Sequence, residues 1–345
     1  MYTKLYTGFL VLTHDCNNRC RWCYELPTGF KKRYMEFEKA KGFLRLMKSL
    51  GITTIGWLGG EPALHPNIFE LTEFAKNLGF KVTLYTNGRI LSNEKFCKRF
   101  KDIGLDFVNL SVQSGSRYKE EHDKVVNVRG AWDETFKGVK NAHKYGLKIN
   151  FQTVISHTNI DIYRDIIDEF APYANIFIFY RLVPIVKLSR NFFEEKVISN
   201  KDTKEMYKKI FLYGKEKGVR TYFFSRMPLC WWNENDPVEK EIHKQVVAHC
   251  HILNGTNLTI DVDGRVLPCA NWAILHSANL VRNGLVVSRE KFLNIFNFGT
   301  PAKIRKKLTY VPDKRCLKCK WFGKRCSGGC PLVKFEIGPY APHTS

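Results

Sequence analysis

The stretch GFLVLTHDCNNRCRWC, residues 8–23, decides how this chain folds and what it can hold. Its first part, Phe9–Thr13, is a short apolar run of the kind that forms a buried strand. Cys16, Cys20 and Cys23 follow it directly. In parallel α/β folds the loops after the strands meet at one site. The stretch therefore predicts a strand that carries three thiols to such a site.

The same strand-then-helix unit repeats six times along residues 1–225. Several predicted helices end at a glycine followed by an apolar residue, as at Gly51-Ile52, which stops a helix before the next strand. Six such units predict a parallel sheet, either an open doubly wound one or an incomplete barrel. The predicted strands are Phe9–Thr13, Thr53–Leu58, Lys81–Thr86, Phe107–Val112, Lys148–Ile155 and Asn175–Tyr180. The predicted helices are Glu36–Leu50, Ile68–Leu78, Asn93–Ile103, Trp132–Tyr145, Ile160–Phe170 and Lys204–Lys217.

Polar residues follow the next three strands as well. The tetrapeptide Gly59-Gly60-Glu61-Pro62 comes after the second strand, Asn87-Gly88 comes after the third, and Ser111 closes the fourth. Because the ends of parallel strands meet at one edge of the sheet, we expect these loops to form one active site together with the cysteine loop.

The cysteines point to metal chemistry. The apolar run at residues 8–12 is too short to span a bilayer and lacks a secretory cleavage site, so we expect a cytoplasmic protein that makes no membrane contact. Disulfides are disfavoured there, and clustered cysteines then indicate metal binding or redox chemistry. Of the 11 cysteines, Cys97 and Cys230 stand alone and three lie near the start. The remaining six are Cys250, Cys269, Cys316, Cys319, Cys326 and Cys330.

The formal charge of +22 is concentrated near the end of the chain. Residues 281–345 carry 14 Lys and Arg against 3 Asp and Glu, which is half of the excess. Such a surface suits an acidic partner: a nucleic acid, an acidic peptide or an acidic electron carrier. The alternative is that the basic side chains offset the charge of thiolate clusters nearby.

Three thiolates suit an iron–sulfur cluster with one free position. A [4Fe–4S] cluster has four irons, so Cys16, Cys20 and Cys23 would leave one iron without a protein ligand. An open position on a metal can bind a substrate, as catalytic zinc sites do. The alternative is a zinc site, which requires four ligands and would take His14 as the fourth.

With Trp22 before its last cysteine, CxxxCxxC after the first strand of a six-fold unit resembles the radical S-adenosylmethionine (SAM) superfamily. The resemblance implies a partial (β/α)6 TIM-like barrel in which SAM binds the open iron. It also implies reductive cleavage of SAM to a 5′-deoxyadenosyl radical that abstracts hydrogen from a substrate. Gly59, Gly60 and Glu61 match the family's motif for the SAM amino group: glycines expose backbone carbonyls, and a carboxylate accepts from an ammonium.

The resemblance implies further cofactor contacts. Ser111 lies where relatives place a serine that contacts SAM, and Arg129 is a candidate for the SAM carboxylate. Gln113 occupies a position that many relatives fill with an acidic residue, so its catalytic role is in doubt. Thr86, Asn87 and Gln152 are weaker candidates for lining the cofactor pocket and could equally be ordinary polar residues at strand ends.

The C-terminal cysteines resemble the SPASM domain, which binds auxiliary iron–sulfur clusters. Cys250 is followed after 13 residues by GRVLPC, residues 264–269, which reads as the second half of a hairpin. The resemblance implies one cluster on Cys250, Cys269 and Cys330 and a second on Cys316, Cys319 and Cys326. The middle spacing is one residue longer than the commonest form, and a seventh cysteine after Cys330 is missing.

Either cluster could therefore have an open iron or a ligand of another type. Cys230 is a candidate to complete the first cluster, and Asp313 or His343 the second. Two alternatives remain: a twitch-type domain with one cluster on Cys250, Cys269, Cys316 and Cys319, or a zinc knuckle at residues 316–330. Cys97 is interpreted as a buried small hydrophobe. Cys230 could be a ligand, a structural thiol or a hydrogen donor to a substrate radical.

We therefore predict a radical SAM domain at 1–225, a linker at 226–249 and an auxiliary-cluster domain at 250–345. The resemblance favours a ribosomally made peptide as substrate, altered by a crosslink, a thioether or epimerisation, and an acidic flavodoxin or ferredoxin as electron donor. The chain starts almost at the first strand, so we expect no fused leader-binding domain. The alternatives are dehydrogenation of a small sugar or aminocyclitol, and RNA modification.

Overall fold

The computed structural model describes residues 4–183, 197–224, 227–272, 277–308 and 313–331. All six predicted strand–helix units are present, and their ends lie within a few residues of the predicted positions. The strands are β1 (Thr7–Thr13), β2 (Thr54–Gly59), β3 (Lys81–Thr86), β4 (Phe107–Ser111), β5 (Ile149–Ile155) and β6 (Ala174–Arg181). The helices that follow them are α1 (Phe37–Ser49), α2 (Ile68–Asn77), α3 (Glu94–Asp102), α5 (Ala131–Lys144), α6 (Tyr163–Phe170) and α8 (Asn200–Glu216).

The chain packs as two compact units that are interleaved along the sequence. The first comprises Met1–Ser111, Val126–Ile149 and His251–Leu308, and the second comprises Val112–Val125, Asn150–Cys250 and Thr309–Ser345. These units group residues by packing and do not test where an auxiliary-cluster domain begins, so the domain boundaries stay a prediction.

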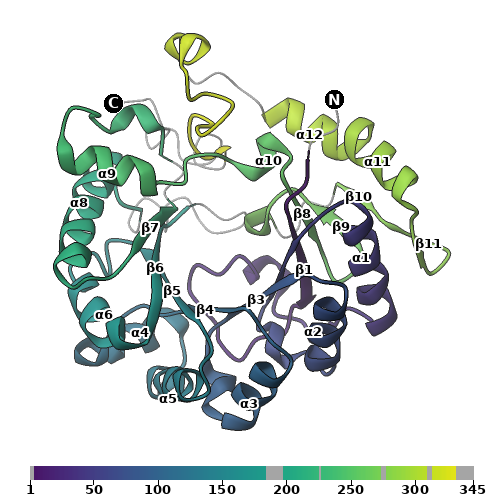
Figure 1. Cartoon of the computed structure of the whole chain (residues 1–345), viewed down its shortest axis with the longest axis horizontal. Coiled ribbons are helices and arrows are strands. Elements are labelled where there is room, and N and C mark those ends of the chain that lie inside the picture. Colours follow the sequence, from purple (N-terminus) through teal and green to yellow (C-terminus); the bar gives the residue numbers. More distant parts are fainter. Residues whose placement is uncertain (1–3, 184–196, 225–226, 273–276, 309–312, 332–345) are drawn as a thin grey trace. The chain divides into compact units, whose positions relative to one another are not determined.

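A mainly parallel sheet forms the centre of the first unit. Its order is β10-β9-β8-β1-β2-β3-β4, and Figure 1 shows α1, α2 and α3 along one side of β1 to β4. β8 (Asn257–Ile260) runs parallel to β1, and β9 (Arg265–Leu267) returns antiparallel to β8. The predicted hairpin is therefore confirmed, and its first strand joins the sheet beside β1.

The burial pattern explains these elements. Leu10, Val11 and Leu12 are all buried on β1, as expected of a parallel strand that is covered on both faces. Helix α1 begins at an N-cap formed by Glu36, whose side chain accepts from the Glu38 N–H. It turns Phe43 and its neighbours toward the sheet, so the apolar stripe of the helix supplies the core.

The second unit contains an aromatic core. β6 lies between β5 and β7 (Thr221–Phe224), and β7 runs parallel to β6. Phe177 stacks on Phe151 and on Phe179, and Phe179 stacks on Phe223. These four rings are fully buried. Such packed rings bury a large apolar area and stabilise the strands that carry them.

The predicted linker at 226–249 contains regular structure. Helix α9 (Pro237–Gln245) begins at Asp236, whose carboxylate accepts from the N–H groups of Val238 and Glu239. An Asp followed by Pro is a strong start signal for a helix, and it is the signal that the linker interpretation missed.

The remaining elements are short. They are α4 (Lys119–Val126), α10 (His251–Asn254), α11 (Arg289–Phe298), α12 (Thr300–Leu308), β10 (Ala278–Asn279), β11 (Val281–Arg282) and β12 (Leu285–Val286). The 3₁₀ turns are η1 (Leu26–Thr28), η2 (Pro62–Leu64), η3 (Arg89–Ser92), η4 (Ser116–Tyr118), η5 (Ala171–Tyr173), η6 (Leu229–Trp231), η7 (Ala270–Trp272) and η8 (Lys314–Lys318). Helix α12 is basic, with Arg305, Lys306 and Lys307 in its last turn. In the part of the chain that the structure describes, every helix is too short or too polar to cross a bilayer.

Close packing of α5 on η3 holds the loop that follows β3. A Cβ on Gly138 of α5 would lie 2.2 Å from the Gly88 carbonyl oxygen, and Thr135 Oγ1 donates to the Asn87 carbonyl at 3.1 Å. The helix therefore touches the backbone of this loop directly, and only glycine fits at the point of contact.

We predict that Gly138→Ala destabilises the protein, although alanine is favoured over glycine in a helix by about 1 kcal/mol. The added methyl meets a backbone atom that cannot move away cheaply, so we expect a net loss of about 1–3 kcal/mol. Thermal unfolding measures it. Lys137→Ala, on the exposed face of the same helix, is the control and should change the midpoint little. A midpoint for Gly138→Ala at or above that of the parent chain would contradict the packing described.

Candidate functional site

Three thiols lie in the loop after β1, where the sequence predicted them. Cys16 is buried, and Cys20 and Cys23 are partly buried. The N–H of Asn18 points at Cys16 Sγ at 3.3 Å, and the N–H of Glu25 points at Cys23 Sγ at 3.4 Å. Such N–H donors stabilise a sulfur that carries negative charge.

The thiols fit a cationic cluster. Burial raises the pKa of the Cys16 thiol to about 12 and that of Cys20 to about 11. Burial also raises the pKa of Cys23 far above its usual range, and the charges of Cys20 and Cys16 add to the effect. The three sulfurs are thus near one another and stay protonated without a positive partner. Bound iron supplies that charge, so these residues fit an iron–sulfur cluster.

His14 does not fit the zinc alternative. Its Nδ1 lies 2.8 Å from Glu25 Oε2, and its Nε2 lies 3.3 Å from Asp261 Oδ1. Burial alone would lower the pKa of His14, but the two carboxylates raise it above its usual value. Both ring nitrogens are therefore engaged. Among the described residues, no three His, Cys, Asp or Glu side chains are grouped so that they could hold a single metal ion.

The glycines of the second loop allow two backbones to meet. A Cβ on Gly59 would lie 2.3 Å from the Thr13 carbonyl oxygen, and one on Gly60 would lie 2.2 Å from that of Asp15. Gly60 N–H donates to the Thr13 carbonyl and Glu61 N–H to the Asp15 carbonyl, each at 2.8 Å. The glycine loop is therefore joined to the start of the cysteine loop through main-chain bonds that a side chain would block.

The side chain of Glu61 is held by hydrogen bonds within the protein. Its carboxylate is fully buried and accepts from Thr86 Oγ1 at 2.8 Å, from the Asn87 N–H at 2.8 Å and from the Ala63 N–H at 3.1 Å. Burial raises its pKa to about 7, although these donors act in the opposite direction. The carboxylate thus ties the loop after β2 to the loop after β3.

Asn87 and Arg89 continue this arrangement toward the cysteines. Asn87 Nδ2 donates to Asn17 Oδ1 at 2.6 Å and lies 3.8 Å from Cys16 Sγ. Arg89 Nη1 donates to Asn18 Oδ1 at 2.9 Å, and Arg89 Nε pairs with Glu134 Oε2 at 2.7 Å. The structure therefore brings the first three polar loops together. Ser111 ends β4, and Arg129 lies exposed in the turn before α5, so their roles stay predictions.

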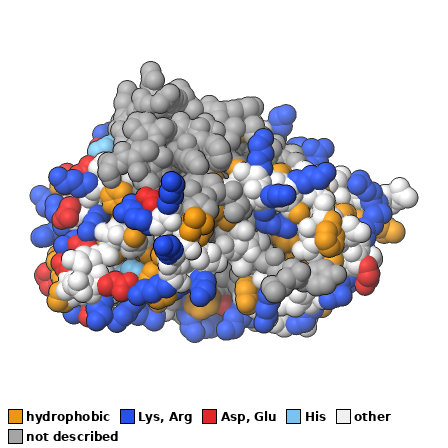
Figure 2. Space-filling model, turned by 90° about the horizontal axis from the view of Figure 1, so that it is seen from above, with side chains coloured by type: hydrophobic (Ala, Val, Ile, Leu, Met, Phe, Trp, Pro, Cys, Tyr) orange, Lys and Arg blue, Asp and Glu red, His pale blue; other side chains and the backbone are white. Residues whose placement is uncertain are grey.

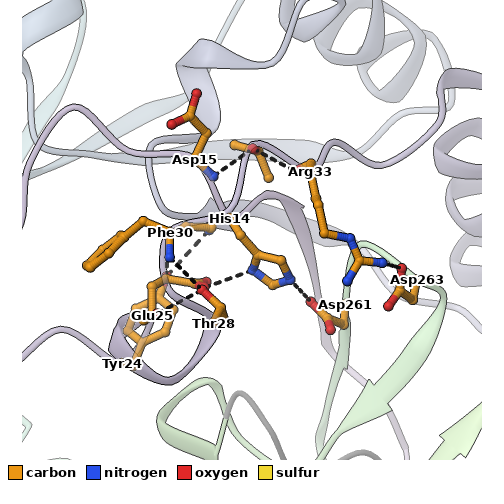
Figure 3. A network of polar contacts seen from close by, with 11 residues as sticks. His14, Asp15, Tyr24, Glu25, Thr28, Phe30, Arg33, Asp261 and Asp263 are labelled. Carbon is orange, nitrogen blue, oxygen red and sulfur yellow. Dashed lines mark hydrogen bonds and ion pairs between the residues drawn. The ribbon is translucent and has the colours of Figure 1, made fainter.

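Figure 3 shows a buried polar network beside the cysteine loop that the sequence did not predict. His14 bridges Glu25, which lies just after Cys23, to Asp261 at the end of β8. Asp263, on the hairpin of β8 and β9, pairs with Arg33, and both side chains are partly exposed. No spacing signal could have found the network, because His14 and Arg33 pair with residues more than 200 positions further along the chain.

The second unit contains the other predicted residues of the barrel. Gln113 is buried, its backbone N–H donates to His122 Nδ1 at 3.3 Å, and its Oε1 accepts no hydrogen bond from a residue that the structure describes. Gln152 Nε2 donates to Tyr180 Oη at 3.1 Å. These contacts leave the catalytic and cofactor roles of both residues as predictions.

Of the C-terminal cysteines, Cys269 lies in the first unit, and Cys250 and the four from Cys316 onward lie in the second. Cys326 pairs with Ala248 in a short bridge, and Cys250 N–H donates to Ser327 Oγ at 2.8 Å. The Gly328 N–H points at Cys326 Sγ at 3.3 Å. Cys97 is buried in α3, as expected, and His343 lies outside the described residues.

Comparison with known proteins finds a family whose model matches the part of the chain that contains this site. Residues 10–170 match the model of the Radical SAM superfamily. An Fe-coproporphyrin III synthase of Methanosarcina barkeri is 28% identical over 43% of this chain and 37% of its own length. A probable GTP 3′,8-cyclase of Pyrococcus horikoshii is 27% identical over 75% of this chain and 82% of its own. The chain thus spans well under half of the first relative and most of the second.

Two solved structures share the fold over almost the whole chain. SuiB of Streptococcus suis, bound to the precursor peptide SuiA, superposes with a TM-score of 0.72 at 16% identity, over 99% of this chain and 75% of that one. Native anSMEcpe, with bound AdoMet and Cp18Cys peptide, superposes with a TM-score of 0.71 at 19% identity, over 98% and 92%. The predicted fold class, a partial α/β barrel with a cysteine-rich C-terminal part, is confirmed.

We predict that Gly60→Ala prevents assembly of the first cluster. Its methyl would displace the Asp15 carbonyl and with it Cys16, so iron bound after anaerobic reconstitution should fall by about one cubane, four irons per chain. Gly218→Ala is the control: its φ of +68° is strained for alanine, but its methyl meets no atom within 4 Å. If Gly60→Ala bound as much iron as the control, the close approach of Gly60 to Asp15 would not be needed for cluster assembly.

We predict that two aspartates of one hairpin differ sharply in importance. Asp261→Ala leaves His14 buried beside a single carboxylate and should cost about 3–5 kcal/mol of unfolding free energy. Asp263→Ala removes only a partly exposed pair with Arg33 and should cost less than about 1 kcal/mol. Denaturant unfolding of the two variants measures both. Equal losses would show that the buried network does not stabilise the cysteine loop.

Proposed function

The chain carries a radical SAM domain at residues 10–170, and from that premise we propose that it modifies a ribosomally made peptide. An enzyme of this superfamily binds SAM on a [4Fe–4S] cluster. When bound, the cluster supplies the electron that cleaves SAM to a 5′-deoxyadenosyl radical, which takes a hydrogen atom from the substrate. The product is a crosslinked, thioether-linked or epimerised peptide.

The residues of the first unit have distinct tasks in this proposal. Cys16, Cys20 and Cys23 hold three irons and leave the fourth for SAM. Gly59 and Gly60 bring their backbone against the cysteine loop, where a carbonyl group can accept from the SAM ammonium. Glu61 also joins the two loops, because its carboxylate accepts from Thr86, Asn87 and Ala63, and it stays a candidate for the SAM ammonium.

The main support for a peptide substrate is the extent of the shared fold. SuiB and anSMEcpe, both crystallised with peptides, match 98–99% of this chain, including its cysteine-rich end. A peptide substrate also agrees with the auxiliary clusters, which would accept an electron from the substrate radical or bind the substrate at an open iron.

A nucleotide substrate is the second candidate. Relatives named as probable GTP 3′,8-cyclases are 26–27% identical over 75–83% of this chain, whereas the two peptide-bound structures described above are 16% and 19% identical. A triphosphate would also suit a strongly basic chain. Sugar or aminocyclitol dehydrogenation and RNA modification have no comparable support.

We also propose an acidic electron donor of the flavodoxin or ferredoxin type and a location in the cytoplasm. Figure 2 shows Lys and Arg side chains outnumbering Asp and Glu on the face that it displays. Such a surface attracts an acidic carrier before contact and makes its association sensitive to salt.

The test is a reaction with dithionite and SAM under anaerobic conditions, with short peptides encoded beside the gene or with GTP. We expect 5′-deoxyadenosine from the reconstituted chain and from Cys97→Ala, and none from the triple variant Cys16→Ala/Cys20→Ala/Cys23→Ala. A peptide should lose two hydrogens in a crosslink, or take up one deuterium from D₂O on epimerisation. If GTP alone is converted and every peptide returns unchanged, the nucleotide candidate replaces the peptide.

A further inference from the structure

The hydroxyl group of Tyr24 joins the cysteine loop to the glycine loop. Tyr24 follows Cys23 directly, and its Oη donates to the Gly59 carbonyl oxygen at 2.6 Å. The same hydroxyl oxygen accepts from the Gly59 N–H at 3.4 Å, so it meets both polar groups of this glycine's backbone. The residue after the last of the three cysteines therefore contacts the first glycine of the motif Gly59–Glu61.

One peptide unit is held at both of its ends. The unit between Gly59 and Gly60 is planar, so its carbonyl and N–H groups turn together. Its carbonyl accepts from Tyr24, and its N–H donates to the Thr13 carbonyl at 2.8 Å. Thr13 and Tyr24 lie just before and just after the three thiols. The orientation of the glycine loop is thus set by the same segment that carries the cysteines.

The contact with Tyr24 lies beyond the end of a strand ladder. The register of β2 with β3 ends at the pair Trp57 and Leu84. Gly59 lies two residues further on, and its φ of +142° belongs to a region that glycine enters freely and other residues rarely adopt. Because glycine has many conformations open to it, a hydrogen bond at this point removes more freedom from the loop than it would at another residue.

The chain at Tyr24 is itself held in place. The next residue, Glu25, is buried; its Oε2 lies 2.8 Å from His14 Nδ1 and accepts from Thr28 Oγ1 at 3.0 Å. Figure 3 shows Tyr24 beside this network. The hydroxyl of Tyr24 therefore connects Gly59 to a part of the chain whose position is already fixed by buried polar contacts.

We propose that Tyr24 is a positioning residue for SAM and acts through the Gly59–Gly60 peptide unit. Its hydroxyl holds the backbone acceptors of the glycine loop in the orientation in which they receive the SAM ammonium. Acceptors that are ordered in advance bind more tightly, because less conformational entropy is lost when the ligand arrives. The proposal rests on the binding of SAM in the proposed function, but it is independent of the substrate.

A titration of Tyr24→Phe with SAM tests the proposal. The reconstituted and reduced chain is titrated, and the SAM-dependent change in its EPR spectrum gives the dissociation constant. The phenylalanine ring keeps the packing, so we expect the iron content of the parent chain. Without the hydroxyl, the dissociation constant of SAM should rise about 3–10-fold, the factor that one hydrogen bond commonly contributes.

Tyr145→Phe is the matched control. Its Oη donates to Glu94 Oε2 at 3.2 Å on the exposed surface of the same unit, so this variant also loses one tyrosine hydroxyl and one hydrogen bond. Its iron content and its dissociation constant for SAM should equal those of the parent chain.

The rate of 5′-deoxyadenosine formation separates positioning from a loss of structure. In Tyr24→Phe the KM for SAM should rise by the same factor, while kcat at saturating SAM changes less than about twofold. A dissociation constant equal to that of Tyr145→Phe would overturn the proposal. So would a fall in iron content, which would assign the hydroxyl to cluster assembly. If SAM left the spectrum of the parent chain unchanged, the proposed function itself would be refuted, and this proposal with it.

Discussion

The first unit depends on one close approach between two stretches of backbone. Gly59 and Gly60 let the loop after β2 lie directly against Thr13 and Asp15, where β1 gives way to the cysteine loop. A side chain at either glycine would enter the space of a carbonyl group. The position of Cys16 follows from this contact, and Glu61 extends it to the loop after β3 by accepting from Thr86 and Asn87. The three loops therefore form one rigid surface before any cofactor is bound.

Charge is the second constraint, and it acts on the three thiols of the cysteine loop. Thiols that are buried or crowded together resist ionisation, because each thiolate would face low polarity and its neighbours' charge. Bound iron removes this penalty. These three cysteines are thus thiols without metal and thiolates with it, so cluster binding is coupled to the loss of their protons. The protein adds backbone N–H donors at Cys16, Cys23 and Cys326 to favour the metal-bound form.

Most of the regular structure of the barrel follows from local patterns. Apolar runs of four to six residues, each ended by a polar loop, predicted β1 to β6, and helix stops such as Gly51 marked where the next strand begins. The same patterns placed Cys16 and Gly59 at the ends of neighbouring strands. Helix α9 was within reach of such reasoning, since Asp236-Pro237 is a helix start.

What could not be predicted depends on contacts between distant parts of the chain. The pairing of β8 with β1 and the bridge from His14 to Asp261 have no local signature. Glu61 shows another limit of sequence reasoning. Its motif identified the loop correctly, but only the structure shows which donors its carboxylate accepts from. Residue type and spacing predicted the chemistry of the site, whereas the partner of each side chain required the fold.

The central claim is that Cys16, Cys20 and Cys23 leave one iron open and that SAM binds to it. EPR spectroscopy of the reduced Cys250→Ala/Cys269→Ala/Cys316→Ala/Cys319→Ala chain, recorded with and without SAM, examines that iron most directly. Direct binding predicts that SAM shifts the g-values of the cubane signal, and that ¹⁵N in the SAM amino group adds a measurable hyperfine coupling. A cubane spectrum that is identical with and without SAM would contradict the account.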